Sequence, residues 1–264
     1  MRYMGGKAKL AKDIIPIITK DLPEDGTFVD LFAGGMNIVD KVDCKDKIAN
    51  DFNKYIIALW REIQSKGTNF LPENVTEDDY RYLRGIYTNN ACAIYSNIQA
   101  LIGFVSTACS YGGGFWNGYA KFNPNKNEDH TKEACNGIRK QVEKFKYLDS
   151  TRFTNYSYHE WLPYSKKNKI LHPNHTLPPA DKCIIYCDPP YANTKHYETD
   201  FNNNSFWAWV KTMAKTHKYK IYVSEYTAPD FMERVWEKEI KCGMGTTYKG
   251  KPQMVKVEKL FVVR

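Results

Sequence analysis

The sequence predicts an α/β fold, with a doubly wound, mostly parallel sheet and an inserted, mainly helical lobe. Three observations support this prediction. Short apolar runs end in polar or turn-forming residues, amphipathic segments alternate with these runs, and one long stretch interrupts the alternation. Short continuous apolar runs are typical of strands that are buried on both faces. Regular alternation of strands with helices is typical of parallel sheets.

Four segments have the length and apolar character of buried strands. They cover residues 27–32, 47–51, 183–187 and 220–224. Between them, apolar residues recur at every third or fourth position, which predicts helices. The helical segments of this kind cover residues 8–19, 53–63 and 206–216.

Two further segments complete the predicted core. Residues 254–263 alternate between apolar and polar side chains and follow a glycine-containing stretch, which predicts the second strand of a hairpin. Residues 165–179 are rich in Pro, Lys and His and predict a loop.

The stretch from residue 65 to residue 149 has a different organisation. Helical patterns cover residues 78–93, 96–107 and 131–145, and a glycine-rich aromatic segment, 111–119, lies between the last two. We therefore predict a core of residues 1–64 and 150–264, with a lobe of residues 65–149 inserted into it. A chain of 264 residues is long enough for this arrangement.

Composition excludes several classes of protein. The formal net charge of +8 is compatible with a polyanionic partner but does not establish one. No apolar run approaches the ~18 residues of a membrane span, and the first residues lack the apolar run of a signal peptide. Seven cysteines without a Cys-x-x-Cys pair disfavour a disulfide scaffold or a zinc knuckle and favour a reducing, intracellular setting.

The sharpest signal for chemistry is Asp188-Pro189-Pro190-Tyr191, directly after a predicted strand. The two prolines end the strand and restrict the backbone, so that the Asp188 carboxylate and the Pro189 carbonyl form a rigid pair of acceptors. They would lie at the carboxyl edge of the sheet, where open α/β folds bind ligands. Two acceptors beside the flat face of Tyr191 suit an exocyclic amine on a planar base. A strand-ending turn with a capping Asp would also explain these residues.

A second signal is Asp30-Leu31-Phe32-Ala33-Gly34-Gly35, at the end of the first predicted strand. Glycines allow a ligand to approach the backbone closely. Asp51 ends the next strand, where an acidic residue binds ribose hydroxyls in nucleoside-binding folds. A third segment, Tyr3-Met4-Gly5-Gly6-Lys7, precedes the first predicted helix. Tight turns and helix caps, with a solvated lysine, are the structural alternative for these segments.

In this order, the motifs resemble those of the Dam-type, class α DNA adenine methyltransferases, which use S-adenosylmethionine. The resemblance covers most of the chain. It rests on Tyr-x-Gly-Gly-Lys, the Asp-x-Phe-x-Gly-Gly loop, Asp51, the inserted lobe, the segment 155–158, Asp-Pro-Pro-Tyr and Val257-Glu258-Lys259-Leu260. It implies a Rossmann-like methyltransferase core with a target-recognition lobe.

The activity implied by this resemblance is site-specific methylation of the N6 amine of adenine in double-stranded DNA. The base would be flipped out of the helix and would attack the methyl group directly, in line, leaving S-adenosylhomocysteine. No metal is implied.

The resemblance also assigns roles to individual residues. Asp188, Pro189, Pro190 and Tyr191 would be catalytic and hold the flipped adenine, and Tyr197 would pack beside it. The cofactor would contact Tyr3, Lys7, Asp30, Phe32, Gly34, Asp51, Ser157, Tyr158 and Asp188. The chain departs from the family pattern at two places. Gly34-Gly35-Met36 replaces a Gly-x-Gly spacing, and Ser157 stands where a carboxylate is common.

DNA binding is expected from the resemblance and from the need to rotate the base out of the duplex, at a cost of a few kcal/mol. Phe115, Trp116 and Tyr119 would stack or wedge in its place, although they would equally suit the core of the lobe. Phosphates would meet basic side chains at Lys121, Lys126, Arg139 and Lys140, for which a solvated face is the simpler interpretation.

Three other functions stay open from sequence alone. A cytosine-N4 DNA methyltransferase uses the same amine geometry, but such enzymes more often have Ser in place of Asp188. An RNA amine methyltransferase is disfavoured by the lobe, and a catalytically silent DNA-binding module by the complete Asp-Pro-Pro-Tyr motif. We expect a cytoplasmic enzyme that acts without a membrane, either alone or with an unlinked restriction nuclease. The sequence does not indicate an oligomeric state.

Overall fold

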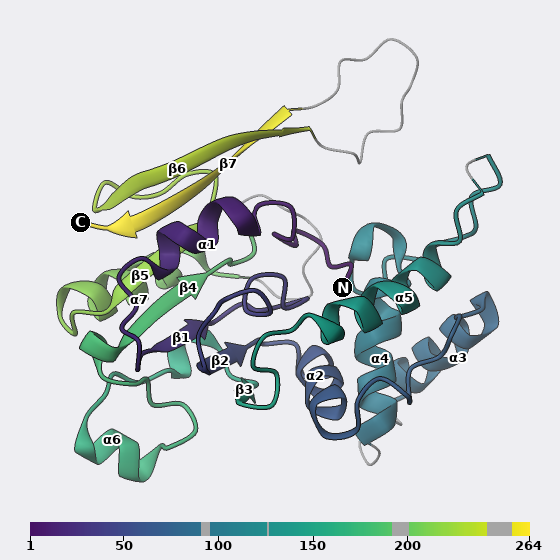
Figure 1. Cartoon of the computed structure of the whole chain (residues 1–264), viewed down its shortest axis with the longest axis horizontal. Helices are drawn as coiled ribbons and strands as arrows, with labels where there is room; N and C mark the ends of the chain where they lie inside the picture. The colour runs from purple at the N-terminus through teal and green to yellow at the C-terminus, as the bar shows by residue number, and fades with distance from the viewer. Residues whose placement is uncertain (91–95, 126, 192–200, 242–254) are drawn as a thin grey trace.

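The computed structural model describes residues 1–90, 96–125, 127–191, 201–241 and 255–264 (Figure 1). Its centre is a seven-stranded sheet with the order β3-β2-β1-β4-β5-β7-β6. The strands are β1 (Thr27–Asp30), β2 (Asp46–Asn50), β3 (Thr151–Thr154), β4 (Cys183–Cys187), β5 (Lys220–Ser224), β6 (Met232–Lys241) and β7 (Val255–Val263). Strands β1 to β5 are parallel, and β7 runs antiparallel to β5 and β6. The predicted mostly parallel α/β fold is confirmed.

The helices alternate with the strands along the chain. They are α1 (Ala11–Thr19), α2 (Lys54–Lys66), α3 (Glu77–Thr88), α4 (Ser96–Ala108), α5 (His130–Glu143), α6 (Lys166–Leu171) and α7 (Asn203–Lys215). Short 3-10 turns occur at Tyr111–Gly113, Tyr158–Glu160 and Ala180–Lys182. Among the described residues, no helix is both long enough and apolar enough to cross a membrane.

Each face of the sheet has its own hydrophobic cluster, because successive residues of a strand point to opposite faces. On one face, Phe28 and Ile184 pack with residues of α1 and α2. On the other face, Val29 and Ile185 pack with α7 and with Trp161. Burial on both faces explains why the central strands are continuous apolar runs in the sequence.

The four predicted core strands and the predicted helices are present, with shifts at their ends. Strand β3 is absent from the sequence-based prediction, and the predicted hairpin did not specify the residues of its first strand, β6. Only Phe153 in β3 is a large apolar residue, and the edge strand β6 is rich in charged residues, so pairing within the sheet identifies both. The predicted loop at 165–179 is partly wrong, because α6 begins there. The Ser165 hydroxyl starts this helix by accepting the Asn168 N–H at 3.0 Å.

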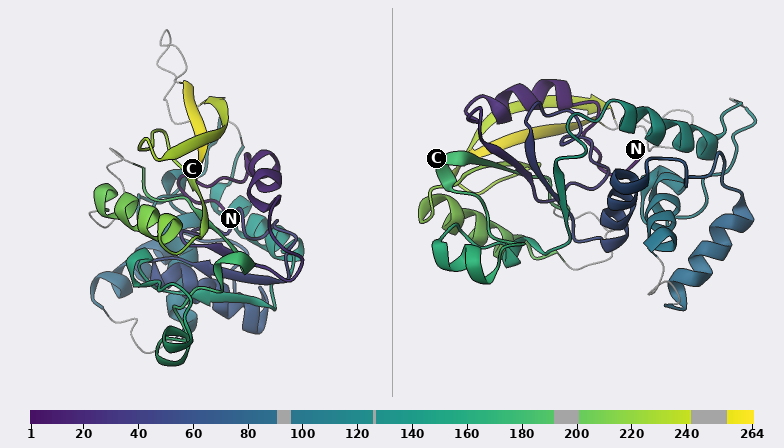
Figure 2. Two further views of the ribbon diagram at one scale, coloured as in Figure 1. Left: turned by 90° about the vertical axis from the view of Figure 1, so that its left-hand side faces the viewer. Right: turned by 60° about the horizontal axis from the view of Figure 1, so that its bottom comes forward.

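Helices α3, α4 and α5 form most of the stretch predicted as a lobe. They gather on one side of the molecule, away from α6 and α7 (Figure 2). Helix α4 packs along α2, and its buried residues Ile102 and Phe104 belong to the same cluster as α1 and the sheet. The boundaries at residues 65 and 149 stay a prediction, since the hydrophobic core continues across them.

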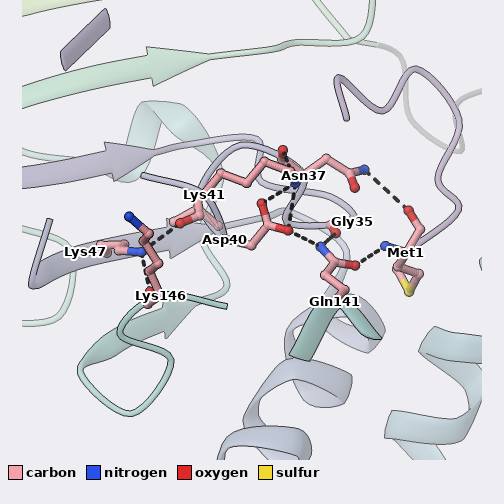
Figure 3. A network of polar contacts seen from close by, with 9 residues as sticks. Met1, Gly35, Asn37, Asp40, Lys41, Lys47, Gln141 and Lys146 are labelled. Carbon is pink, nitrogen blue, oxygen red and sulfur yellow. Dashed lines mark hydrogen bonds and ion pairs between the residues drawn. The ribbon is translucent and has the colours of Figure 1, made fainter. Parts of the chain in front are cut away.

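Polar side chains join the lobe to the segment after β1 (Figure 3). Gln141 of α5 donates its amide to Gly35 O at 3.0 Å and to Asp40 Oδ2 at 2.9 Å. The buried ammonium of Lys47, on β2, donates to Val39 O at 2.9 Å. The Gln141 contacts join the segment that follows β1 to α5, and the Lys47 contact joins it to β2.

The packing of α4 on α2 predicts a large effect of one methyl group. A Cβ at Gly103 would lie 2.1 Å from the Tyr55 carbonyl oxygen, so the two helices could not keep their spacing. We expect Gly103→Ala to lower the free energy of unfolding by about 1–3 kcal/mol, as overpacking does in well-packed cores. Urea denaturation followed by circular dichroism measures this change.

Gly85 on α3 and Gly137 on α5 provide matched controls, because a Cβ at either position meets no neighbouring atom within 4 Å. Ala is the better helix former, so Ala at either position should raise the stability by about 0.5–1 kcal/mol. Similar stability changes at all three positions would contradict the close approach of α4 to α2.

Candidate active site

A cavity of about 1680 Å³ lies at the carboxyl ends of β1 and β4. These strands are neighbours, but the next parallel strands, β2 and β5, lie on opposite sides of them. Open α/β sheets bind ligands at such a switch point. The lining comes from segments that are far apart in the sequence: 3–7, 30–35, 51–55, 155–160 and 188–191, with further residues from the lobe and β7.

On the side of β1 and β2, Asp51 holds the glycine loop that follows β1. Asp51 Oδ2 accepts the Gly34 N–H at 2.8 Å, and Oδ1 accepts the Asn53 N–H at 2.8 Å. Burial raises the pKa of Asp51 to about 6, although these two N–H groups favour the charged form. A carboxylate can accept about four hydrogen bonds, so Asp51 keeps acceptor capacity for a ligand in the cavity.

Tyr3 packs directly on this glycine loop. Gly34 has a φ of +45°, and a Cβ there would lie 2.6 Å from the Tyr3 ring. A Cβ at Gly35 would lie 2.8 Å from the Cβ of Tyr3. On the lobe side, Gly113 O accepts the Met4 N–H at 2.9 Å. The Gly34-Gly35 pair therefore fits the close packing of Tyr3, and the unusual spacing of the glycines has a structural reason.

Aromatic rings form one wall of the cavity. The Phe32 ring lies 6.1 Å from the Tyr158 ring and 5.8 Å from the Phe201 ring. The Tyr158 ring lies 5.8 Å from the ring of Trp209, on α7. All four side chains line the cavity. Such a wall offers apolar surface and edge contacts to a planar ring system.

A carboxylate lies beside Ser157, although the sequence has none at that position. The Ser157 N–H donates to Glu160 Oε2 at 2.7 Å, and the Ser157 hydroxyl is 2.8 Å from His159 Nδ1. All three residues line the cavity. The capping box of the 3-10 turn Tyr158–Glu160 thus places the Glu160 carboxylate beside Ser157.

Two buried polar residues support this edge of the sheet. Asp30 is 2% exposed, and its Oδ1 accepts the Phe32 N–H at 3.2 Å. Burial raises the pKa of Asp30 well above its usual value. Asn50 donates its amide to Leu31 O at 3.0 Å and to Tyr156 O at 2.9 Å. Asn50, which the sequence analysis did not select, therefore ties the segments after β1 and β3 together.

On the side of β4, Asp188 pairs with a lysine from the beginning of the chain. Lys7 Nζ lies 2.9 Å from Asp188 Oδ1 and 3.7 Å from Glu258 Oε2. The Tyr191 hydroxyl donates to the same Glu258 oxygen at 2.8 Å, and Lys7 Nζ lies 4.6 Å from the centre of the Tyr191 ring. Only 5% of the Lys7 side chain and 17% of the Asp188 side chain are exposed. The four side chains form a nearly dry cluster at one end of the cavity.

Burial raises the pKa of Asp188, and the nearby Glu258 acts in the same direction, whereas Lys7 opposes both. Pro189 and Pro190 line the cavity next to Asp188. The structure therefore brings the motif after β4 and the loop after β1, which were two separate signals in the sequence, to one cavity.

Comparison with known families identifies the chain. The family model of the D12 class N6 adenine-specific DNA methyltransferases matches residues 3–234. The chain belongs to this family. The match includes the Tyr3–Lys7 segment, the glycine loop, the lobe and the motif at Asp188, and it confirms the Dam-type resemblance.

Relatives of this D12 class chain include two curated bacterial proteins. "Modification methylase StsI" of Streptococcus sanguinis is 30% identical over 223 residues, which cover 78% of this chain and 31% of that protein. "Type II methyltransferase M.FokI" of Planomicrobium okeanokoites is 39% identical over 59 residues, 22% of this chain and 9% of that protein. The chain spans less than a third of the length of these relatives.

Among solved structures, the rRNA methyltransferase aviRa from Streptomyces viridochromogenes is similar to this chain. It has a TM-score of 0.37 and 12% sequence identity, and the comparison covers 97% of this chain and 84% of that chain.

The three lobe aromatics predicted to meet DNA lie in different environments in this D12 class structure. The Phe115 side chain lines the cavity, with its ring 6.2 Å from the Tyr55 ring. Trp116 is 8% exposed and packs against Tyr80 at 5.0 Å, edge to face. Tyr119 is partly buried, and its hydroxyl donates to a backbone carbonyl oxygen at 2.8 Å. Trp116 and Tyr119 thus fill the core of the lobe here, whereas Phe115 reaches the cavity.

The basic residues predicted to meet phosphates also differ from one another. Lys121 is largely exposed and lies 3.6 Å from Glu77, and Lys140 is exposed. The Arg139 guanidinium instead donates to the carbonyl oxygens of Leu71 and Cys135, which fixes it within the lobe. Two other predicted contacts, Lys126 and Tyr197, lie outside the described residues.

Three residues that line the Asp188 end of the cavity had no predicted role: Tyr226, Lys256 and Glu258. The Tyr226 ring lies 4.6 Å from the Tyr191 ring, edge to face, and Lys256 Nζ lies 5.4 Å from the centre of the Tyr226 ring. The sequence pointed to Glu258 only indirectly, because the segment Val257–Leu260 is part of the family resemblance. Nothing in the sequence distinguishes Tyr226 from the other tyrosines.

The ring and the hydroxyl of Tyr191 should contribute separately to catalysis by this D12 class site. Tyr191→Phe keeps the ring and loses the hydrogen bond to Glu258, and a hydrogen bond to a charged group is worth about 1.5–3 kcal/mol. Glu258 then still has Lys7 nearby, so we expect about a tenfold loss of kcat. Tyr191→Ala also loses the ring face, and stacking of a base on an aromatic ring adds about 1–3 kcal/mol. Steady-state kinetics on DNA should therefore rank Phe above Ala; equal rates would contradict the stacking role.

Proposed function

We propose that this chain transfers the methyl group of S-adenosylmethionine to the N6 amine of a flipped adenine at a specific site in double-stranded DNA. The observation that carries the proposal is one cavity with two chemically different ends. Asp51 and the glycine loop line one end, and Asp188 with Tyr191 lines the other. A site for one small molecule usually has a volume of about 300–1,000 Å³. The larger volume here leaves room for a nucleoside cofactor and a base together.

The residues at the first end fit S-adenosylmethionine. The partly buried Asp51 carboxylate, held by two backbone N–H groups, would accept the ribose hydroxyls. Phe32 and Tyr158 would pack against its adenine ring, and Glu160 brings a carboxylate to the same wall. When bound, the cofactor supplies a methyl group on a positively charged sulfur.

The residues at the second end fit an exocyclic amine. The lone pair of the adenine amine is conjugated with the ring, which makes it a poor nucleophile. The Asp188 carboxylate and the Pro189 carbonyl would accept its two N–H bonds and favour a tetrahedral, nucleophilic nitrogen. Fixed acceptors in a nearly dry site act more strongly than in water. Tyr191 would hold the plane of the base, with Tyr226 packed against the Tyr191 ring.

DNA contacts would come from the lobe. Phe115 lines the cavity and would meet bases at its mouth, whereas the buried Trp116 would support it from behind. The exposed Lys121 and Lys140 would contact phosphates. Phosphate contacts of this kind position the enzyme without reading the sequence. Replacing either lysine should therefore weaken binding similarly on all DNA sequences.

The relatives support a place in DNA modification. One is named a modification methylase and the other a type II methyltransferase, and both names suit an enzyme paired with a separate restriction nuclease. The cysteines that the structure describes, Cys44, Cys109, Cys135, Cys183 and Cys187, are free. This suits the reducing cytoplasm in which such an enzyme would meet DNA.

Nucleoside mass spectrometry tests the proposal directly. The protein is incubated with S-adenosylmethionine and unmethylated double-stranded DNA of high sequence diversity, and the digested DNA is analysed. We expect N6-methyladenine, in a sequence context that sequencing then maps. Methylcytosine in place of methyladenine would overturn the choice of base, and methylation confined to RNA would overturn the choice of substrate.

Absence of any methyl mark would contradict the proposed activity. Cofactor binding, measured by calorimetry, then separates two explanations. An enzyme for a different substrate would bind S-adenosylmethionine, whereas a silent DNA-binding module has no need to do so.

A further inference from the structure

The catalytic carboxylate lies in a cluster of charges that comes from three parts of the chain. Lys7, before α1, contacts Asp188, after β4, at 2.9 Å. Glu258, on β7, lies 3.7 Å from the same ammonium and accepts the Tyr191 hydroxyl at 2.8 Å. Two carboxylates therefore share one ammonium in a site where Lys7 is 5% and Glu258 6% exposed.

This arrangement does not resemble a structural surface ion pair. Removing two acids and one base from water is costly, and a hydrophobic replacement of such a cluster is often neutral or stabilising. The net charge of the three groups is negative when all are ionised. The groups therefore serve something other than stability, and their position at the catalytic end of the cavity indicates what it is.

Asp188 is a strong, acceptor-only partner for an amine N–H only when it is ionised, because protonation turns one of its oxygens into a donor. The neighbouring groups act on its ionisation in opposite directions. Lys7 favours the charged form, whereas burial and Glu258 oppose it. A hydrogen bond from Tyr191 also favours the charged form of Asp188. Asp30, the last residue of β1, is a further acid that interacts with Asp188. Burial raises the pKa of Tyr186 and of Cys187 well above their usual values, so these two neighbours on β4 are uncharged near neutral pH. Among the described groups, Lys7 is the cation that contacts Asp188.

We propose that Lys7 and Glu258 are positioning residues for methyl transfer: Lys7 keeps Asp188 an acceptor, and Glu258 holds Lys7 and the Tyr191 ring in place. Lys7 thereby has a role at the target amine beyond contact with the cofactor. Glu258 links the β6–β7 hairpin to the reacting end of the cavity. This inference rests on the proposed function for its kinetic consequence, but its electrostatic part concerns the free protein.

The pH dependence of kcat/KM tests this proposal, because two variants should shift its acid limb in opposite directions. In Lys7→Met the positive charge is lost, the pKa of Asp188 rises, and the acid limb of kcat/KM moves to higher pH. In Glu258→Gln a negative charge is lost, the pKa of Asp188 falls, and the acid limb moves to lower pH. Both variants should lose roughly 10–10²-fold in kcat at their optimum, because the acceptors or the ring are less well held.

Three further variants make the test specific. Lys7→Arg keeps the charge and should leave the acid limb near that of the wild type. The double variant Lys7→Met with Glu258→Gln should have an acid limb between those of the single variants. Lys9→Met and Glu239→Gln are matched controls, since both side chains are exposed. Lys9 lies two residues after Lys7, and Glu239 lies on β6, opposite Val257, the neighbour of Glu258 on β7. Neither control should move the limb.

Carbon-13 NMR of the Asp188 carboxyl group in the free protein measures the ionisation of Asp188 directly, without the need for catalysis. The Asp188 titration should move upward in Lys7→Met and downward in Glu258→Gln. Shifts in the same direction, or no shift, would overturn the inference even if the wild type methylates adenine. If the wild type transfers no methyl group, the proposed function fails, and the NMR titration still decides the role of the cluster.

Discussion

Asp188→Ala is expected to abolish methyl transfer, with a loss of kcat of at least about 10³-fold. Removing one preorganised hydrogen-bonding group from a reacting centre costs about 10²–10³-fold in rate, and Asp188 also carries the charge of the acceptor pair. The fold should survive this change. The Asp188 side chain is 17% exposed at the cavity, and Lys7 keeps Glu258 as a counter-ion at 3.7 Å.

Single-turnover methylation with labelled cofactor measures this effect. Asp181→Ala is the matched control, because Asp181 is exposed and precedes β4, at the opposite end from Asp188. The control should methylate DNA like the wild type. Cofactor affinity should fall far less than methyl transfer in Asp188→Ala, since Asp51 and the aromatic wall are untouched, and should not change in Asp181→Ala. Methylation by Asp188→Ala at a near wild-type rate would show that the amine has other acceptors.

Asp51→Ala should have the second largest effect, on cofactor binding. The variant loses the acceptor for the ribose hydroxyls and also frees the N–H groups of Gly34 and Asn53. Hydrogen bonds to a charged group contribute about 1.5–3 kcal/mol each, so we expect the Kd for S-adenosylmethionine to rise at least about 10²-fold. Calorimetry on the free protein measures this. Asp46 is exposed and begins β2, the strand that Asp51 follows, so Asp46→Ala should bind the cofactor like the wild type.

The pKa of Asp51, raised by burial to about 6, also predicts a pH dependence of cofactor binding. The ionised carboxylate is the acceptor, so affinity should be full above this pH and fall as the pH drops through about 6. Asp51→Asn removes the titrating group and should bind weakly with a much smaller pH dependence between pH 5 and about 7.5. An unchanged pH profile in Asp51→Asn would assign the dependence to another group.

The core fold could be predicted because its elements carry their pattern locally. The strand β4 is a continuous apolar run that ends at two prolines, and α2 has apolar residues at helical spacing after the capping residue Asn53. The edge strands β3 and β6 carry no such pattern, because one face or edge of each is polar. Their neighbours in the sheet, rather than their own residues, determine their conformation.

The candidate site could be predicted to the extent that its motifs are contiguous. The residues of Asp188–Tyr191 are adjacent in sequence, as are those of Asp30–Gly35, so each motif sets its own local backbone. The order of strands places both motifs at one edge of the sheet. The role of Trp116 could not be predicted in this way. A glycine-rich aromatic segment suits both a DNA wedge and a small core, and only packing against Tyr80 distinguishes them in the free protein.

The sequence by itself determined the class of chemistry, because short motifs set which acceptors, glycines and rings follow each strand. Tertiary structure alone decided which charges meet. Lys7, Asp188 and Glu258 come from the beginning, the middle and the end of the chain, and no local pattern predicts that they share one nearly dry site. Electrostatic interactions in such a site depend on distance and burial in space rather than on separation in sequence. The ionisation of the Asp188 carboxylate is therefore a property of the folded chain.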